Sequence, residues 1–115
     1  MIKSENRLRK NKHFRYIYKH GETKTYKALT VTFVETKFKT IKVGFSVSKK
    51  IGKSVVRNKV KRRLRESFVS LQKNIKPNRN YIFTAKQGIE NLDFHEIRQN
   101  MMEILKKNGL YIENN

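Results

Sequence analysis

The chain has 115 residues with 28 lysines and arginines, nine acids and no cysteine, which gives a formal net charge of +19. The length predicts a single domain, and the lack of cysteine excludes disulfides and thiolate metal sites. The charge favours encounters with nucleic acid. We find neither an apolar run long enough to cross a bilayer nor a signal-like segment after Met1, so the default expectation is a cytoplasmic location.

The first ten residues are polar and basic, which predicts a basic N-terminal arm over 1–10. Asn11 can cap a short helix over 12–20, and Gly21 suits its C-terminal end. Three residues share one side of this helix. We expect the isoleucine to pack on a sheet and the two aromatic residues to remain partly free: Phe14, Ile17 and Tyr18.

Two stretches, 26–34 and 41–48, alternate between apolar and polar residues, which is the pattern of strands with one buried face. They are joined by the polar stretch 35–40, and the simple interpretation is a pair of antiparallel strands connected by it. A further short strand is expected at 23–26.

The faces of these strands opposite the apolar residues carry only small or polar groups: Thr30, Thr32, Gly44 and Ser46. Beside the short helix they would form the floor of a shallow groove, in which bases could stack on Phe14 or Tyr18. The alternative is that a loop or the N-terminal arm fills this groove.

A long basic helix occupies the middle of the chain. After a turn at 49–53, Ser54 can cap a helix that runs to about Asn74. Apolar residues at helical spacing predict one buried stripe: Val56, Val60, Leu64, Phe68 and Leu71. The other side is almost entirely cationic between Arg57 and Arg65, a pattern that destabilises an isolated helix and suits a polyanionic partner. A membrane-surface helix is disfavoured because the apolar stripe is expected inside a mixed α/β pattern.

The remaining elements complete a small α+β domain. Residues 81–86 predict a buried strand, and Asp93 with Glu96 forms the capping-box pattern of a last helix that Gly109 ends. The core side of that helix is expected to consist of Phe94, Ile97, Met101, Ile104 and Leu105. The predicted order is α-β-β-β-α-β-α, with helices packed on a small mixed, mainly antiparallel sheet.

No constellation for protein-based catalysis stands out. The histidines lack the spacing and the cysteine companions of a zinc site: His13, His20 and His95. A two-histidine nuclease of His13 and His20 would separate the rings by about 10 Å along a helix, which is long for one scissile phosphate. The basic helix could enter a DNA major groove, but its density of lysine and arginine suits the phosphates of a folded RNA better. Asn58 is the exception, since it can bond a base or a sugar.

These residues resemble a known family, the protein subunit of bacterial ribonuclease P. The resemblance is most specific at 44–50 (GFSVSKK), Gly52 and the triplet Arg57-Asn58-Lys59, which matches the family's arginine-asparagine-arginine signature with lysine in the last place. A second match lies near the N-terminus, in Arg7, Leu8, Phe14, Tyr18, His20 and Gly21. The resemblance covers nearly the whole chain.

The resemblance implies a single RNA-binding domain over 1–115, with the left-handed βαβ crossover of the fold named after domain 2 of ribosomal protein S5. It also implies a subunit of an endoribonuclease that removes the 5′ leader from precursor tRNA. In that enzyme the RNA carries the chemistry with Mg²⁺, and the protein holds the leader in a central cleft. The expected partners are ribonuclease P RNA and precursor tRNA, with no membrane and no protein partner required.

The same resemblance assigns the site residues, with no catalytic or metal-binding residue in the protein itself. The expected RNA-binding residues are Lys49, Lys50, Lys53, Arg57, Asn58, Lys59, Lys61, Arg62 and Arg65. The expected leader cleft consists of Lys12, Phe14, Tyr18, His20, Thr32 and Ser46. Lys59 in place of arginine loses a bidentate fork, and the family often has an aromatic residue at the position of Thr32.

Two other functions stay open at the level of sequence. One is a ribosomal or ribosome-assembly RNA-binding protein without an enzymatic role, because the basic helix alone does not separate it from the first reading. The other is the protein-only nuclease.

Overall fold

The computed structural model describes residues 2–113. Its four strands form one sheet in the order β1 (Glu22–Tyr26), β2 (Leu29–Glu35), β4 (Arg79–Ala85) and β3 (Ile41–Ser46). β2 is antiparallel to both β1 and β4, whereas β3 is parallel to β4. The sheet is therefore mixed and mainly antiparallel, and the order of elements is the predicted one.

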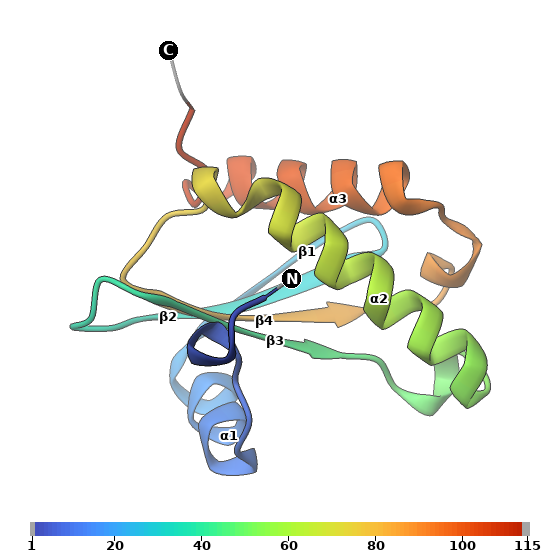
Figure 1. Ribbon diagram of the computed structural model, residues 1–115, viewed down its shortest axis with the longest axis horizontal. Helices are drawn as coiled ribbons and strands as arrows, with labels where there is room; N and C mark the ends of the chain where they lie inside the picture. The colour runs from blue at the N-terminus through green and yellow to red at the C-terminus, as the bar shows by residue number, and fades with distance from the viewer. Residues whose placement is uncertain (1, 114–115) are drawn as a thin grey trace.

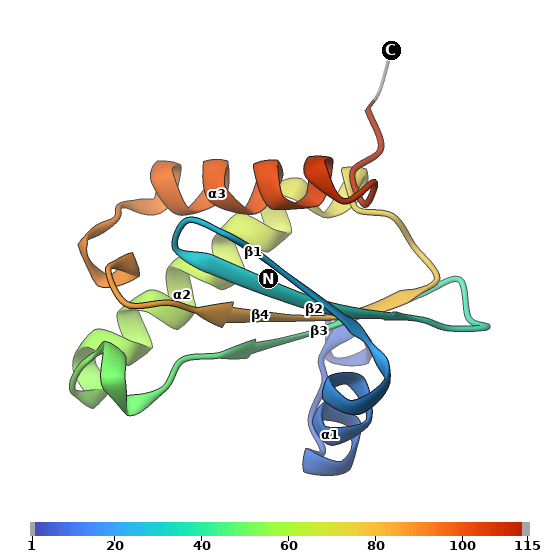
Figure 2. The ribbon, with the colours of Figure 1, turned by 180° about the vertical axis from the view of Figure 1, so that it is seen from behind.

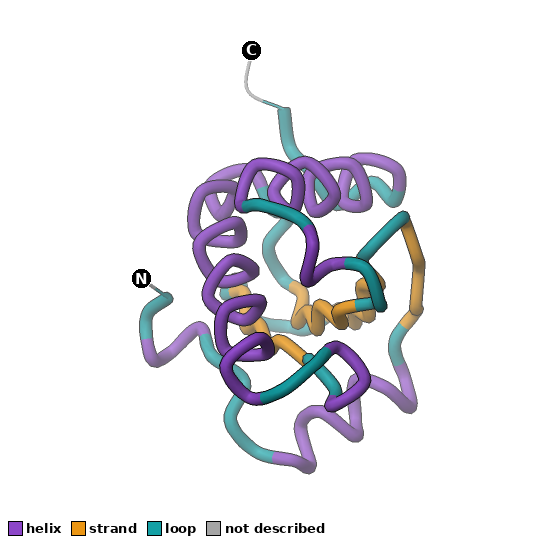
Figure 3. The backbone as a smooth tube through the Cα atoms, turned by 90° about the vertical axis from the view of Figure 1, so that its right-hand side faces the viewer, coloured by secondary structure: helices purple, strands orange, loops and turns teal. Residues whose placement is uncertain are grey.

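Three helices cover the two faces of this sheet. α1 (Asn11–His20) lies on one face, and α2 (Ser54–Leu71) and α3 (Phe94–Lys107) lie together on the other (Figures 1 and 3). The main core fills the space between the sheet and α2 with α3. A smaller cluster under α1 contains Leu8, Ile17 and Ile82, with Phe14 packed against it.

The predicted direct pairing of the second and third strands is wrong. β2 and β3 run in opposite directions, but β4 lies between them: Val31 is opposite Phe83, and Val43 is opposite Tyr81. The reason is that β4 is apolar on both faces, since Tyr81, Ile82 and Phe83 are all fully buried. Such a strand needs neighbours on both edges and helices on both faces, so it takes a central place in the sheet. The left hand of the β3–α2–β4 crossover stays a prediction.

β1 and β2 form the actual hairpin, which lies next to α3 when the molecule is seen from behind (Figure 2). Tyr26, predicted to open the longer strand, instead ends β1 and pairs with Leu29. The two-residue turn contains Lys27, whose φ of 51° is in the left-handed region.

Two predicted helix caps are wrong. Asn11 and Ser54 are the first residues of their helices, Lys10 and Lys53 hold the N-cap positions, and neither cap makes a side-chain hydrogen bond. The capping box of α3 is confirmed: Glu96 N donates to Asp93 Oδ1 at 2.9 Å, and Asp93 N donates to Glu96 Oε1 at 3.2 Å.

The long helix ends earlier as an α-helix than predicted. α2 stops at Leu71 and continues as a 3-10 turn over Gln72–Asn74, the predicted end. Gly21 ends α1 with an extended backbone, not a left-handed one. It is required there because a Cβ would lie 2.6 Å from the carbonyl oxygens of both Ile17 and Phe33.

The N-terminal arm is docked on the fold. Leu8 N donates to Val43 O at 3.0 Å, and Asn6 Nδ2 donates to Ile41 O at 2.7 Å. Ile2 and Leu8 are buried. The arm therefore covers part of the outer edge of β3, which would otherwise carry unpaired backbone groups.

Candidate RNA interface

The apolar side of α2 is buried as its spacing predicts. Val60, Leu64 and Phe68 have almost no exposed surface, Leu71 is buried with them, and Val56 packs against the same core from a half-buried position. This burial fixes the rotation of the helix about its axis, so the cationic residues between these positions must face outward.

The outward side of α2 and the turn before it form one cationic surface, here called the basic face. The lysines of the turn, together with Asn58, Lys59 and Arg62, are exposed, and the other members are half-buried. The basic face consists of Lys49, Lys50, Lys53, Arg57, Asn58, Lys59, Lys61, Arg62 and Arg65.

The turn is held against the start of α2 by two contacts. Ile51 is buried in the main core, and Arg57 Nε donates to Gly52 O at 3.1 Å. Gly52 has a φ of +154°, and a Cβ there would lie 3.1 Å from Val56 Cβ. A glycine is therefore needed for the turn to approach the helix this closely. The turn lysines consequently lie beside the N-terminus of α2, whose dipole adds to the positive potential.

Carboxylates compete little for the basic face. Within residues 2–113, its one ion pair joins Arg62 Nε to Glu66 Oε1 at 3.6 Å, and both side chains are more than half exposed. An exposed i,i+4 pair of this kind is weak. Arg57 bonds a backbone carbonyl and not an acid. The cations are thus available to an anionic ligand.

The opposite face of the sheet, under α1, is partly covered. Thr32 is 1% exposed and lies 3.0 Å from Thr23 through the two hydroxyls. Gly44 is covered by Phe14 and Leu8, and a Cβ there would lie 2.7 Å from Phe14 Cε1. The arm and α1 therefore fill this part of the predicted groove, and Thr32 is not available to a ligand in this structure.

The neighbouring row of the same face is open. Its four residues align across all four strands and all carry hydroxyls, and they are here called the hydroxyl row: Thr25, Thr30, Thr84 and Ser46. Tyr18, which is 48% exposed, places its hydroxyl 3.5 Å from Thr84 Oγ1 at the border of α1. The structure thus brings Tyr18 and Ser46 to one open surface.

The hydroxyl-bearing face and the basic face meet around the edge of β3. A hollow of about 190 Å³ at this edge is lined by Phe14 of α1, by Gly44 of β3, by Lys61 and Arg65 of α2, and by Arg7 and Leu8 of the N-terminal arm.

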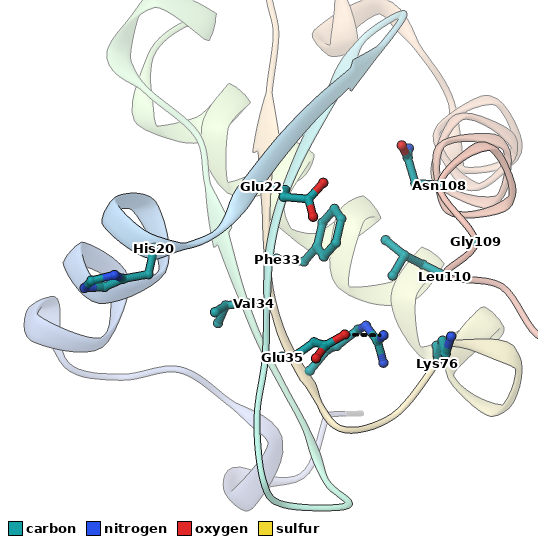
Figure 4. Close-up of a pocket in the computed structure, with 10 residues that line it drawn as sticks. His20, Glu22, Phe33, Val34, Glu35, Lys76, Asn108, Gly109 and Leu110 are labelled. Atoms are coloured by element: carbon teal, nitrogen blue, oxygen red, sulfur yellow. Dashed lines mark hydrogen bonds and ion pairs between the residues drawn. The ribbon is translucent and has the colours of Figure 1, made fainter.

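His20 lies elsewhere. Its ring is 4.5 Å from that of Tyr16, on the side of α1 away from Tyr18. It borders a different hollow of about 480 Å³ that also contains Glu22 and Phe33, and its ring points away from them (Figure 4). Lys12 is exposed in the first turn of α1. His20 is thus not brought together with Tyr18 and Ser46.

Comparisons with known proteins agree on one family. A family model described as ribonuclease P matches residues 2–109. The chain is 40% identical over 108 residues to a ribonuclease P protein component of Clostridium botulinum, covering 93% of this chain and 97% of that protein. The chain belongs to the ribonuclease P protein family. A relative from Caldanaerobacter subterraneus is 38% identical over 107 residues, covering 93% of this chain and 92% of its own length.

Solved structures of the family have the same fold. The ribonuclease P protein of Staphylococcus aureus superposes with a TM-score of 0.84 at 31% identity, covering 92% of this chain and 97% of that one. The protein of Thermotoga maritima gives a TM-score of 0.81 at 27% identity, covering 94% and 98%. These matches confirm the predicted family and α+β fold, and they do not favour the ribosomal alternative.

Sequence reasoning missed two residues of the hydroxyl row, Thr25 and Thr84. Thr84 was hidden by the wrong pairing of β2 with β3, since it belongs to the strand between them. Thr84 could have been recognised from the sequence, because it is the one polar residue in the apolar stretch 81–85. No helix within residues 2–113 is long and apolar enough to cross a membrane.

Proposed function

We propose that this ribonuclease P protein binds its catalytic RNA through the basic face and the 5′ leader of precursor tRNA along the hydroxyl row. The observation that carries the proposal is the division of α2, whose apolar side is buried and whose cationic side is available. Lysines and arginines at this density bind phosphates without reading bases, which suits a folded RNA.

The hydroxyl row supports the leader half of the proposal. A single strand that passes over it meets hydroxyl donors and acceptors from all four strands and the exposed ring of Tyr18. Stacking on an aromatic ring accepts any base and contributes about 1–3 kcal/mol. A leader of variable sequence needs that tolerance.

The chemistry of leader removal belongs, in this proposal, to the RNA and its Mg²⁺. The basic face offers guanidinium and ammonium groups, whereas Mg²⁺ prefers carboxylate, carbonyl and phosphate oxygens. RNA phosphates supply such oxygens. The role of the protein is to bind and orient both RNAs, and endonucleolytic 5′ maturation of tRNA is the activity of the assembled particle.

Reconstitution tests the whole proposal. The protein, a bacterial ribonuclease P RNA and precursor tRNA are mixed at low Mg²⁺, and cleavage is compared with each component alone. We expect the protein to stimulate the RNA and to be inactive without it. Cleavage by the protein alone would support the nuclease alternative, and a competent RNA without stimulation would contradict the proposal.

Two exposed tyrosines of α1 test the leader contact separately. Tyr18→Ala should weaken binding of precursor tRNA by the particle about 5- to 150-fold, the range expected for one stacked base, with little effect on mature tRNA. Tyr16→Ala is the matched control, since Tyr16 is 57% exposed on the other side of the same helix. Equal losses for both variants, or for both RNAs, would remove the hydroxyl row from the proposal.

A further inference from the structure

The loop between β2 and β3 presents an aromatic ring to solvent. Phe38 is 72% exposed, more than either exposed tyrosine of α1. A single exposed apolar side chain is common on protein surfaces, so the exposure of Phe38 points to a contact only together with the structure and charges around it.

Hydrogen bonds hold this loop in place. Thr36 N donates to Asn78 O at 2.8 Å, and Asn78 Nδ2 donates to Phe38 O at 2.9 Å. Phe38 N also donates to Thr36 Oγ1 at 3.3 Å. Asn78 adopts a φ of 63°, which asparagine tolerates better than most residues. The backbone N–H and C=O of Phe38 are thus both hydrogen-bonded, while its ring is exposed to solvent.

The surroundings of the ring are cationic. Lys37 and Lys39 flank Phe38 and are exposed. The acid at the base of the loop, Glu35, is engaged by Arg79 Nη2 at 3.1 Å (Figure 4). An aromatic ring between two exposed lysines matches a nucleotide, whose base can stack on the ring while the lysines neutralise its adjoining phosphates.

We propose that Phe38 stacks on an unpaired base of the ribonuclease P RNA, with Lys37 and Lys39 on the phosphates beside it. This contact rests on the proposed function and adds a second attachment point. β3 separates the loop from the turn of the basic face, a length of about 20 Å for six residues. Figure 1 shows the loop at the left end of the sheet and that turn at the right.

The position of α1 favours the catalytic RNA over the leader as the source of this base. The row Thr32–Gly44, covered by α1 and the arm, lies between the hydroxyl row and the loop. A leader on the hydroxyl row would have to pass that covered row to reach Phe38. A large folded RNA bound to the basic face can extend an unpaired loop to it.

The chain contains no tryptophan, so a tryptophan introduced at position 38 gives a fluorescence signal from that position alone. In Phe38→Trp the indole emission should be quenched when ribonuclease P RNA is added. Tyr16→Trp is the matched control at an exposed ring with no assigned role, and its emission should not change. Phe38→Ala and Phe38→Leu should each weaken RNA binding about 5- to 150-fold. Phe38→Tyr keeps an aromatic ring and should bind RNA as the wild type does.

Other results overturn the inference in distinguishable ways. If the wild type binds the RNA but Phe38→Trp is not quenched and Phe38→Leu binds normally, the contact does not exist and the proposed function stands. Quenching by a leader oligonucleotide alone would assign the ring to the leader instead. A change of emission with protein concentration and no RNA would indicate a second copy of the chain. If the wild type does not bind the RNA, the proposed function fails as well.

Discussion

Glu66 is the one acid that contacts the basic face within residues 2–113, and removing its charge should strengthen RNA binding. Its carboxylate lies 3.6 Å from Arg62 Nε, so an RNA phosphate must compete with it for that guanidinium. Exposed pairs contribute about 0.2–1 kcal/mol, and the order with arginine before the acid is the weaker one on a helix. Glu66→Gln should therefore lower Kd by a factor of about 1.4 to 5.

The salt dependence gives a second, independent number. A freed Arg62 can neutralise one more phosphate, so the slope of log K against log salt should become steeper by about 0.7–0.9. Binding of the variant to ribonuclease P RNA is measured by anisotropy over a series of salt concentrations. In a parallel thermal melt, Glu66→Gln should lose no more stability than the exposed Arg62–Glu66 ion pair contributes.

Glu103→Gln is the matched control. It changes the net charge by the same amount on α3, where Glu103 accepts a hydrogen bond from Gln99 at 3.2 Å. Equal gains in both variants would mean that only net charge matters. An unchanged slope in Glu66→Gln would mean that Arg62 does not face RNA, and either result would refute the reasoning.

Three further predictions concern the core. Ser67 has a buried hydroxyl with no hydrogen-bond partner among the described residues, so Ser67→Ala should raise stability by about 1 kcal/mol in a melt. Leu64→Ala should cost about 2–5 kcal/mol and leave the RNA affinity of the folded protein unchanged. Burial removes the Tyr81 hydroxyl from water and raises its pKa above its ordinary value, an effect that the charge of the nearby Arg79 partly opposes. The hydroxyl donates to Lys76 O at 2.6 Å. The folded state then keeps a proton that the unfolded state loses, so stability falls as pH rises above about 10, and Tyr81→Phe should flatten that fall in urea unfolding.

Each of these has a contrary result. Ser70→Ala should destabilise, since Ser70 Oγ donates to Ser67 O and accepts from Arg98 Nε. A gain of stability in Ser70→Ala would show that the gain in Ser67→Ala comes from the higher helix propensity of alanine and not from removal of the buried hydroxyl. A parallel loss of RNA affinity in Leu64→Ala would show that the two sides of α2 are not separable. Identical alkaline slopes for Tyr81→Phe and wild type would remove the tyrosine from the pH dependence.

Helical features were predictable because their determinants are local. The spacing of Val60 and Leu64 fixed the buried side of α2, and Asp93 with Glu96 fixed the start of α3. The two wrong caps show that a residue type common at N-caps does not by itself locate the first residue of a helix. Asn11 and Ser54 lie one position inside their helices, where the side chain cannot reach the amides that a cap bonds.

Neighbours in the sheet were not predictable from alternation. The period-two pattern identifies a strand and its faces but says nothing about which strand lies beside it. Thr32 does lie on the face predicted for it, yet α1 and β1 bury it. His20 was assigned through the family resemblance. Its distance of two residues from Tyr18, about 200° around a helix, already placed it on the other side.

The central place of β4 has a consequence for how the chain acquires its structure. β2 and β3 leave the ribosome long before their common neighbour, and neither can complete its pairing until residue 85 has been made. During that interval the apolar residues of α2 have no completed sheet to pack against. Sheet closure over such sequence distances is slow compared with helix formation, so the chain is most exposed to aggregation just before β4 pairs with its two neighbours.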